Sequence, residues 1–94
     1  AEKGAYLTEK LRALNSPAIR EVRAEGLWIG VELTITVAPL LEWLQNHGLL
    51  CPPAGLTVLR FLPPAVITFD QLDQAVELVG QGLAALTQPA GAEQ

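Results

Sequence analysis

The chain is poor in the residues that carry most redox, metal and nucleophilic chemistry. Its 94 residues include one cysteine, Cys51, and one histidine, His47. A single cysteine cannot form an internal disulfide, and this low cysteine content fits a reducing compartment. A metal site would need further ligands beside His47, and a cysteine nucleophile would need a base held by a third group. Neither a metal site nor thiol catalysis is expected.

Positive charge is also scarce, because six lysine and arginine residues stand against ten aspartate and glutamate residues, for a net charge of −4. Nucleic-acid binding relies on a basic surface, so nucleic acid is not an expected partner. The apolar runs are short and are interrupted by Glu32, Glu42, Arg60 and prolines, so no membrane span is expected. The pattern of a secretory signal is not found either, and we expect a cytoplasmic protein.

Apolar residues, by contrast, are plentiful and make up half of the chain. This composition and length predict one small folded domain with a modest core. The chain opens at Ala1, within a predicted helix rather than at an initiating methionine. We therefore expect it to be a piece of a larger protein.

Apolar residues at helical spacing predict a first helix that ends before Pro17, because the residue before a proline disfavours helix. Its inward stripe is Leu7, Leu11 and Leu14. A second helix is expected to begin with Thr36 as its N-cap and to end before Gly48, which tolerates the left-handed conformation. Its inward stripe is Val37, Leu40, Leu41 and Leu44.

A third helix is expected to begin with Asp70 as its N-cap, because Asp73 follows near the spacing of a capping box. Gly80 and Gly82 lie inside this helix and weaken it by about 1 kcal/mol each relative to alanine. Its inward stripe is Leu72, Val76, Val79, Leu83 and Leu86, and its polar stripe is Gln71, Gln74, Glu77 and Gln81.

Two β-segments are predicted between the first and second helices, at residues 19–24 and 27–33, joined by a turn at Glu25-Gly26. Apolar and other residues alternate with a period of two in the second segment. Leu27, Ile29, Val31 and Leu33 form one set, and they alternate with Trp28, Gly30 and Glu32. A further strand is predicted at residues 57–62.

The predicted order of elements is therefore α-β-β-α-β-α. Short strands and short connections favour a small, largely antiparallel sheet covered by helices, which is an α+β fold. The predicted domain covers residues 1–86, and residues 87–94 are expected to form a flexible tail because of their turn and polar composition.

Arg60 is the one charged residue in the apolar run Leu56–Ile67. A guanidinium keeps its charge and offers five planar donors that match a carboxylate or a phosphate. Strand alternation places Arg60 and Leu59 on opposite faces of the sheet. This pattern alone favours a structural role, in which Arg60 reaches solvent or pairs with a glutamate. The alternative is a binding site for an anion.

The other candidate residues have structural interpretations. His47 lies where a helix is expected to end and fits a capping or surface position, and Cys51 fits a small buried apolar residue. Trp43 lies off the leucine stripe of its helix and is a candidate for an exposed interface, whereas Trp28 fits a core position at least as well. No acid–base pair is evident among the carboxylates, for which solvated positions are expected: Glu21, Glu25, Glu32 and Glu42.

Several segments resemble segments of the class III aminotransferases that use pyridoxal phosphate. Residues 20–33 resemble the pattern EVRGxGLxxGxEL, and residues 57–67 resemble VLRFxPPLxI. Residues 4–14 resemble the helix that precedes both in that family. Residues 51–57 are similar to an LPAGPT turn, which places the likeness closest to the acetylornithine and acetyl-lysine aminotransferase branch. The likeness extends over residues 4–86.

The resemblance implies the C-terminal small domain of a fold-type I, homodimeric enzyme. It implies that Arg60 binds the α-carboxylate of an amino-acid or keto-acid substrate during transamination. The lysine that carries the cofactor belongs to the large domain of such enzymes, and neither Lys3 nor Lys10 matches it. The fragment alone is therefore expected neither to bind pyridoxal phosphate nor to catalyse, and it contains no catalytic residue. The departures from the family pattern, Ala24 for glycine and Ala65 for leucine, are mild.

Three hypotheses follow for function. The first is a domain of an aminotransferase, with the missing large domain as its partner. The second is an independent α+β module that binds a small anionic metabolite through Arg60. The third is a structural interaction domain, with Arg60 in solvent and Trp43 at an interface.

Overall fold

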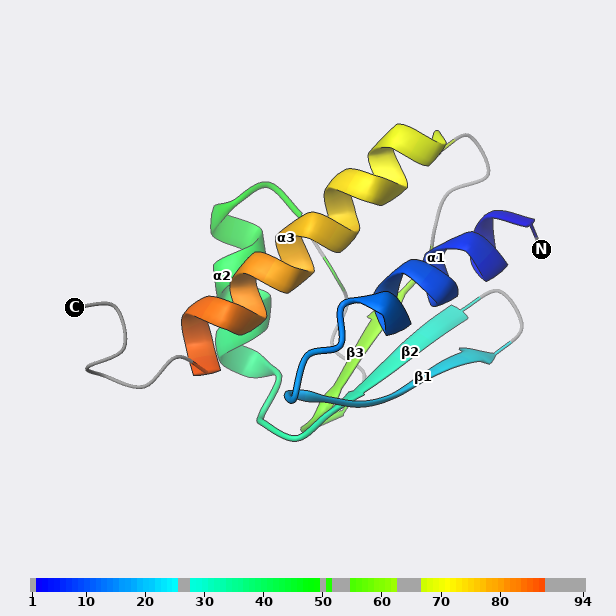
Figure 1. Cartoon of the computed structure of the whole chain (residues 1–94). Coiled ribbons are helices and arrows are strands. Elements are labelled where there is room, and N and C mark those ends of the chain that lie inside the picture. Colours follow the sequence, from blue (N-terminus) through cyan, green and yellow to red (C-terminus); the bar gives the residue numbers. More distant parts are fainter. Residues whose placement is uncertain (1, 26–27, 50, 52–54, 63–66, 88–94) are drawn as a thin grey trace.

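A computed structural model describes residues 2–25, 28–49, 51, 55–62 and 67–87 of the chain. Three helices and three strands lie within these residues, in the predicted order α-β-β-α-β-α (Figure 1). Their bounds are α1 Glu2–Ala13, β1 Ile19–Glu25, β2 Trp28–Leu33, α2 Ala38–Asn46, β3 Val58–Phe61 and α3 Phe69–Thr87. Helices α1 and α3 lie on the same side of the sheet, so the predicted α+β fold is confirmed.

The described strands form one antiparallel sheet in the order β1-β2-β3. The register aligns the row Val22, Val31 and Leu59 across the sheet, followed by the row Arg23, Gly30 and Arg60. Successive side chains on a strand point to opposite faces. The first row therefore points toward the helices and the second row points away from them.

The face of the sheet toward the helices is apolar and buried. The predicted period of two is confirmed for the described residues of β2, because Ile29, Val31 and Leu33 are buried, and β3 adds Leu59 and Phe61. The predicted Leu27 lies outside the described residues. Burial of a large aliphatic or aromatic side chain contributes about 1.5–3 kcal/mol. The helices cover these residues with Leu7, Leu11, Leu40, Leu44, Leu72, Val76, Val79 and Leu83.

Helix α2 packs closely on α3 at Gly82, which is buried. A Cβ atom at this position would lie 2.8 Å from both Leu40 Cδ1 and Trp43 Cε3. Glycine costs some helical stability here. Its lack of a side chain is what allows the two helices to approach, a role that the sequence did not reveal.

Both predicted N-caps are wrong by one or two residues. The N-cap of α2 is Val37 rather than Thr36, and it makes no side-chain capping bond. Helix α3 is capped by Thr68 rather than Asp70: the Gln71 amide donates to Thr68 Oγ1 at 3.0 Å, and the Thr68 amide donates to Gln71 Oε1 at 2.9 Å. This reciprocal pair is a capping box, and its Thr-x-x-Gln spacing is visible in the sequence.

Asp73 serves a different purpose from the predicted one. Its Oδ1 accepts a 2.6 Å hydrogen bond from the Tyr6 hydroxyl, which ties α1 to α3. The Tyr6 ring also meets the Phe69 ring edge-on, with centroids 4.8 Å apart. Because the hydroxyl bonds to a carboxylate, the pKa of Tyr6 lies above its usual value.

Several other boundaries differ slightly from the prediction. Strand β3 begins at Val58 rather than residue 57, Leu86 is 38% exposed rather than inward-facing, and Thr87 is the last residue of α3 rather than part of a tail. Gly48 follows α2 with φ of 93°, as predicted. The proposed tail at residues 88–94 lies outside the described residues, as does Gly26 in the predicted turn.

Candidate functional site

The candidate site is on the face of the sheet that points away from α1 and α3, which we call the outer face. No helix or strand in the described part of the chain covers it (Figure 1). Its side chains come from alternate positions on the three strands. They are Glu21, Arg23, Trp28, Glu32, Val58 and Arg60, with Gly30 between the two arginines.

Arg60 is half-buried on this face, near the middle of β3. Its Nε is buried and has no hydrogen-bond partner among the described residues. The guanidinium Cζ lies 5.2 Å from the centroid of the Trp28 ring, which is within the range of a cation–π contact. The structure therefore presents a cation that an aromatic ring supports and that no described carboxylate neutralises.

The carboxylates on the outer face are engaged by other residues. Glu32 Oε2 accepts a 2.7 Å hydrogen bond from Thr57 Oγ1, and Glu32 Oε1 lies 3.7 Å from Arg23 Nη2. Glu21 Oε1 lies 3.1 Å from Arg23 Nη1. The glutamate partner that the pattern favoured for Arg60 is thus not found among the described residues.

Trp28 was not identified from the sequence as part of this site. A core position seemed at least as suitable, but Trp28 lies half-buried on the outer face beside Arg60. The signal was available in part, because the alternation in residues 27–33 sets Trp28 with Glu32 and apart from Ile29. Its proximity to Arg60 depends on the register between β2 and β3, which a single sequence does not reveal.

The second tryptophan belongs to the packed layer of helices rather than to an exposed interface. Trp43 is partly buried against the core and next to Gly82 on α3. Its ring stacks on the ring of His47, with centroids 3.7 Å apart. The exposed His47 ends α2 as predicted, and its Nδ1–H donates to the Trp43 carbonyl oxygen at 2.7 Å.

Cys51 is partly buried against the core, in line with the prediction of a small apolar role. Burial raises the pKa of its thiol to about 11, which keeps it protonated and poorly nucleophilic at neutral pH. Within the described residues, no group of three or more histidine, cysteine, aspartate and glutamate side chains could hold a metal ion.

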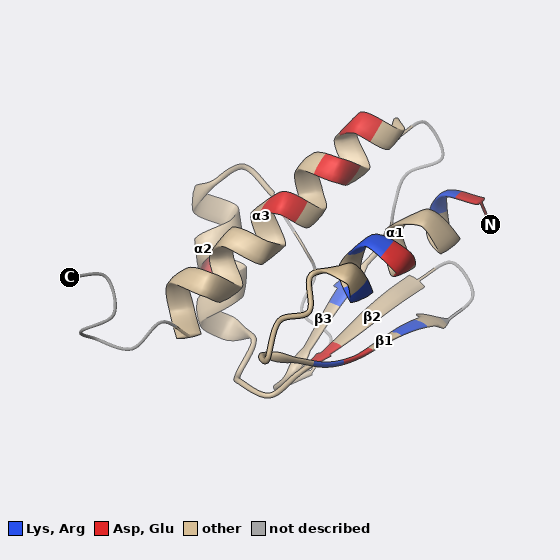
Figure 2. Ribbon diagram, in the orientation of Figure 1, with Lys and Arg blue, Asp and Glu red and all other residues tan. Residues whose placement is uncertain are grey.

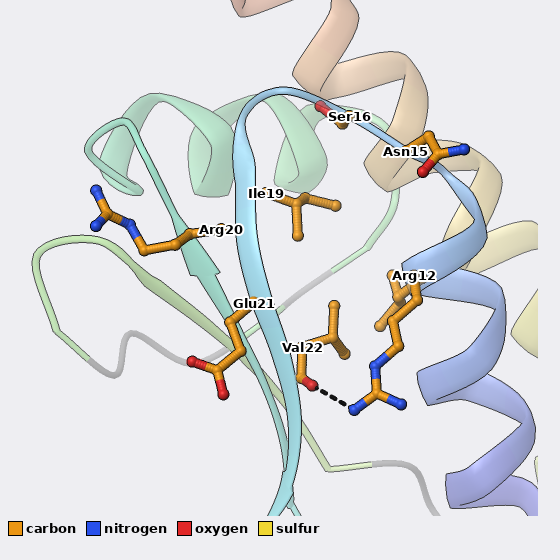
Figure 3. Close-up of a pocket in the computed structure, with 8 residues that line it drawn as sticks. Arg12, Asn15, Ser16, Ile19, Arg20, Glu21 and Val22 are labelled. Carbon is orange, nitrogen blue, oxygen red and sulfur yellow. Dashed lines mark hydrogen bonds between the residues drawn. The ribbon is translucent and has the colours of Figure 1, made fainter.

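A cleft of about 430 Å³ between α1 and β1 is one alternative location for a site (Figure 3). Arg12 projects into it, but its Nη2 donates to the Val22 carbonyl oxygen at 2.8 Å and so fastens α1 to β1. Arg20 and Glu21 point away from Arg12. The polar groups around this cleft do not converge, which indicates a structural junction.

Charged residues lie on the sheet as well as on the helices. Figure 2 shows the acidic residues of α3 in its first half and arginines on β1 and β3. The acidic residues are Asp70, Asp73 and Glu77.

No helix in the described part of the chain is long and apolar enough to cross a membrane.

The fold is that of a domain from an aminotransferase. The chain belongs to the class-III aminotransferase family, whose family model matches residues 1–83. It is 55% identical over 76 residues to a [LysW]-aminoadipate semialdehyde transaminase from Deinococcus radiodurans, covering 80% of this chain and 18% of that protein. It is 46% identical over 82 residues to an ornithine aminotransferase from Brevibacillus brevis, covering 87% and 21% of the two chains.

Solved structures agree with the family assignment. An ornithine aminotransferase from Plasmodium yoelii matches 89% of this chain and 24% of its own, with a TM-score of 0.80 and 26% identity. A lysine aminotransferase from M. tuberculosis matches 92% and 21%, with a TM-score of 0.82 and 27% identity. The chain spans about a fifth of the length of the curated relatives it matches, and it is a fragment of the aminotransferase fold.

Class-III aminotransferases depend on pyridoxal phosphate, but the residues of this chain do not fit that cofactor. The cofactor is carried on a lysine amine, and the chain has two lysines, Lys3 and Lys10, both on α1. Their Nζ atoms lie over the rings of Phe69 and Tyr6, at 5.8 and 5.5 Å from the centroids. Helix α1 also covers the face of the sheet opposite to Arg60.

Proposed function

We propose that this chain is the C-terminal small domain of an aminotransferase of the acetylornithine or acetyl-lysine type, and that Arg60 binds the α-carboxylate of its substrate. The parent enzyme acts in arginine or lysine biosynthesis, as a cytoplasmic homodimer. The names of the relatives, which act on ornithine or on aminoadipate semialdehyde linked to LysW, support this substrate class.

The observation that carries the proposal is the unpaired charge of Arg60. A half-buried guanidinium without an anion loses part of its hydration, and an incoming carboxylate restores the missing interaction. Arg60 has no ion pair with a described residue, while Glu21 and Glu32 are held by Arg23 and Thr57. The outer face is therefore suited to an anion that comes from outside this chain.

Arg60 contributes binding and orientation rather than bond making. Two parallel N–H donors of a guanidinium match the two oxygens of a carboxylate, and this fixes the direction of the rest of the substrate. A charge-assisted contact of this kind contributes about 1.5–3 kcal/mol. The reacting groups then come from the large domain, which supplies the lysine and pyridoxal phosphate.

The test is a comparison of two amines in the full-length holoenzyme. Ornithine carries an α-carboxylate, and putrescine is its decarboxylated counterpart. We expect Arg60→Ala to raise the KM for ornithine by about 10- to 150-fold, the equivalent of that contact, and to leave the KM for putrescine unchanged. Arg60→Lys keeps the charge and should recover only part of the loss, because ammonium lacks the planar fork.

Arg20→Ala provides the matched control, because it removes the same charge from an exposed position on β1. This variant should keep the wild-type KM for ornithine. An Arg60→Ala enzyme that loses ornithine and putrescine activity equally, or that keeps its KM for ornithine, would contradict the proposal.

A further inference from the structure

The position of Trp28 relative to Arg60 follows from the register of the sheet. Gly30 lies directly across from Arg60, and the neighbouring outward positions on β2 are Trp28 on one side and Glu32 on the other. Arg60 can therefore contact either an aromatic ring or a carboxylate. The structure places it over the ring, with Cζ 5.2 Å from the centroid.

Glu32 is kept from Arg60 by its own contacts. Thr57 donates to one carboxylate oxygen at 2.7 Å, and Arg23 lies 3.7 Å from the other. These contacts engage both oxygens of the carboxylate. Among the described residues, the indole of Trp28 then lies next to the guanidinium, and the negative face of its ring attracts the cation.

We propose that Trp28 is a positioning residue that holds the Arg60 guanidinium ready for the substrate carboxylate, an inference that rests on the proposed function of Arg60. A cation–π contact is made to the face of an aromatic ring, which carries no carboxylate oxygen. The N–H donors of the guanidinium lie in its plane and project from its edges. Contact with Trp28 therefore supports the charge without placing a carboxylate of the protein on those donors.

An ion pair with Glu32 would have the opposite consequence. A carboxylate of the protein would occupy the same donors that the substrate needs, and the substrate would have to displace it. The arrangement of Trp28, Arg60 and Glu32 thus keeps Arg60 both ordered and available to a substrate carboxylate. This ordering lowers the entropic cost of binding, because the arginine side chain is already restricted.

The inference is tested with Trp28→Leu and Trp28→Phe in the full-length holoenzyme. We expect Trp28→Leu to raise the KM for ornithine about three- to tenfold, with kcat changed less than about twofold, because the contact acts on binding. Trp28→Phe keeps an aromatic face and should recover most of the loss. Trp43→Leu removes the other indole, far from the outer face, and should leave KM unchanged.

A double variant separates positioning from general packing. If Trp28 acts through Arg60, then Trp28→Leu should raise KM no further in an Arg60→Ala enzyme. An equal further rise in that background would overturn the inference, as would a wild-type KM in Trp28→Leu. A wild-type KM in Arg60→Ala would instead overturn the carboxylate role of Arg60 and, with it, the inference.

A spectroscopic measurement covers the case in which Trp28→Leu does not fold. Trp28 emission is the difference between the fluorescence of the wild-type enzyme and that of Trp28→Phe. We expect ornithine to change this emission in the wild-type enzyme and not in Arg60→Ala. An emission that does not respond to saturating ornithine would overturn the inference.

Discussion

The two faces of the sheet differ in what their residues are used for. Toward the helices, Ile29, Val31 and Leu59 are buried among aliphatic side chains and need no partner beyond close packing. On the outer face, alternate residues of the same strands carry charge, and Arg60 keeps a buried Nε without a hydrogen bond. One strand thus serves stability with one set of residues, and under the proposed function it serves recognition with the set between them.

The comparison separates the residues that stabilise the fold from those that are available for binding. A packed apolar face is stable whatever the molecule binds, because the hydrophobic effect is not directional. A half-buried cation gains little for stability by itself and requires a partner. Under the proposed function, the residues that act together with the rest of the protein are therefore on the outer face.

The largest effect is expected from breaking the helix-covered face. Leu59→Ala removes a fully buried side chain and should lower the unfolding free energy of the domain by about 2–5 kcal/mol. Val58→Ala, the neighbouring substitution on the outer face, should cost less than about 1 kcal/mol. Native-state hydrogen exchange of the β2 and β3 amides in the full-length protein measures both. Equal losses would contradict the division between the two faces.

The next effect tests the close approach of α2 and α3. Gly82→Ala introduces a Cβ 2.8 Å from Leu40 and Trp43 and should lower the unfolding free energy by about 1–3 kcal/mol, despite the better helix propensity of alanine. Gly80→Ala is the control, because its Cβ would lie 3.0 Å from the flexible end of Leu14. It gains the same propensity and should be close to neutral. Thermal unfolding of the full-length protein compares the two, and an equal fall in midpoint would contradict this packing.

A smaller effect is expected on the outer face from Thr57→Val, which keeps the shape of the side chain. The change frees Glu32 Oε2 from its 2.7 Å hydrogen bond and allows this carboxylate to compete for Arg60. We expect the KM for ornithine to rise about two- to fivefold, within the range of one lost hydrogen bond. Adding Glu32→Gln should reverse the rise. A KM that is unchanged in Thr57→Val would show that Glu32 does not compete.

The smallest effect concerns the pH dependence of Cys51. Its pKa is raised by burial from 9.0 to about 11 in the folded chain. The unfolded thiol therefore ionises first, and the unfolding free energy should fall as the pH rises from about 9 toward 11. Cys51→Ser should flatten this part of the pH profile. Alkylation of Cys51 by iodoacetamide at pH 8 should also be much slower than that of a free thiol, and rapid alkylation would contradict its burial.

Residue periodicity was sufficient to predict the order of elements and the faces of β2 and β3. The pattern in residues 27–33 and the placement of Leu59 opposite Arg60 depend only on strand geometry, which is local. Helix starts were predicted less accurately. Thr68 and Asp70 are both good capping residues, and the hydrogen bonds between Thr68 and Gln71 identify Thr68 as the cap. Asp73, which was expected to complete a capping box with Asp70, instead accepts a hydrogen bond from Tyr6.

The candidate site could be predicted only in part. Arg60 stood out because a charge in an apolar run is unusual, but its partners could not be inferred from that pattern. They depend on the register that brings Gly30 opposite Arg60 and on the contacts that engage Glu32. Contacts between segments about 30 residues apart in the sequence are set by the whole fold rather than by local pattern.

A crystal structure of the full-length holoenzyme with a bound amino-acid ligand tests the central claim most directly. We expect both α-carboxylate oxygens of the ligand within about 3 Å of the Arg60 guanidinium nitrogens, in the plane of that group. The Trp28 ring should remain within cation–π distance of the guanidinium. A ligand carboxylate bound elsewhere, with Arg60 paired to a carboxylate of the protein, would contradict the account.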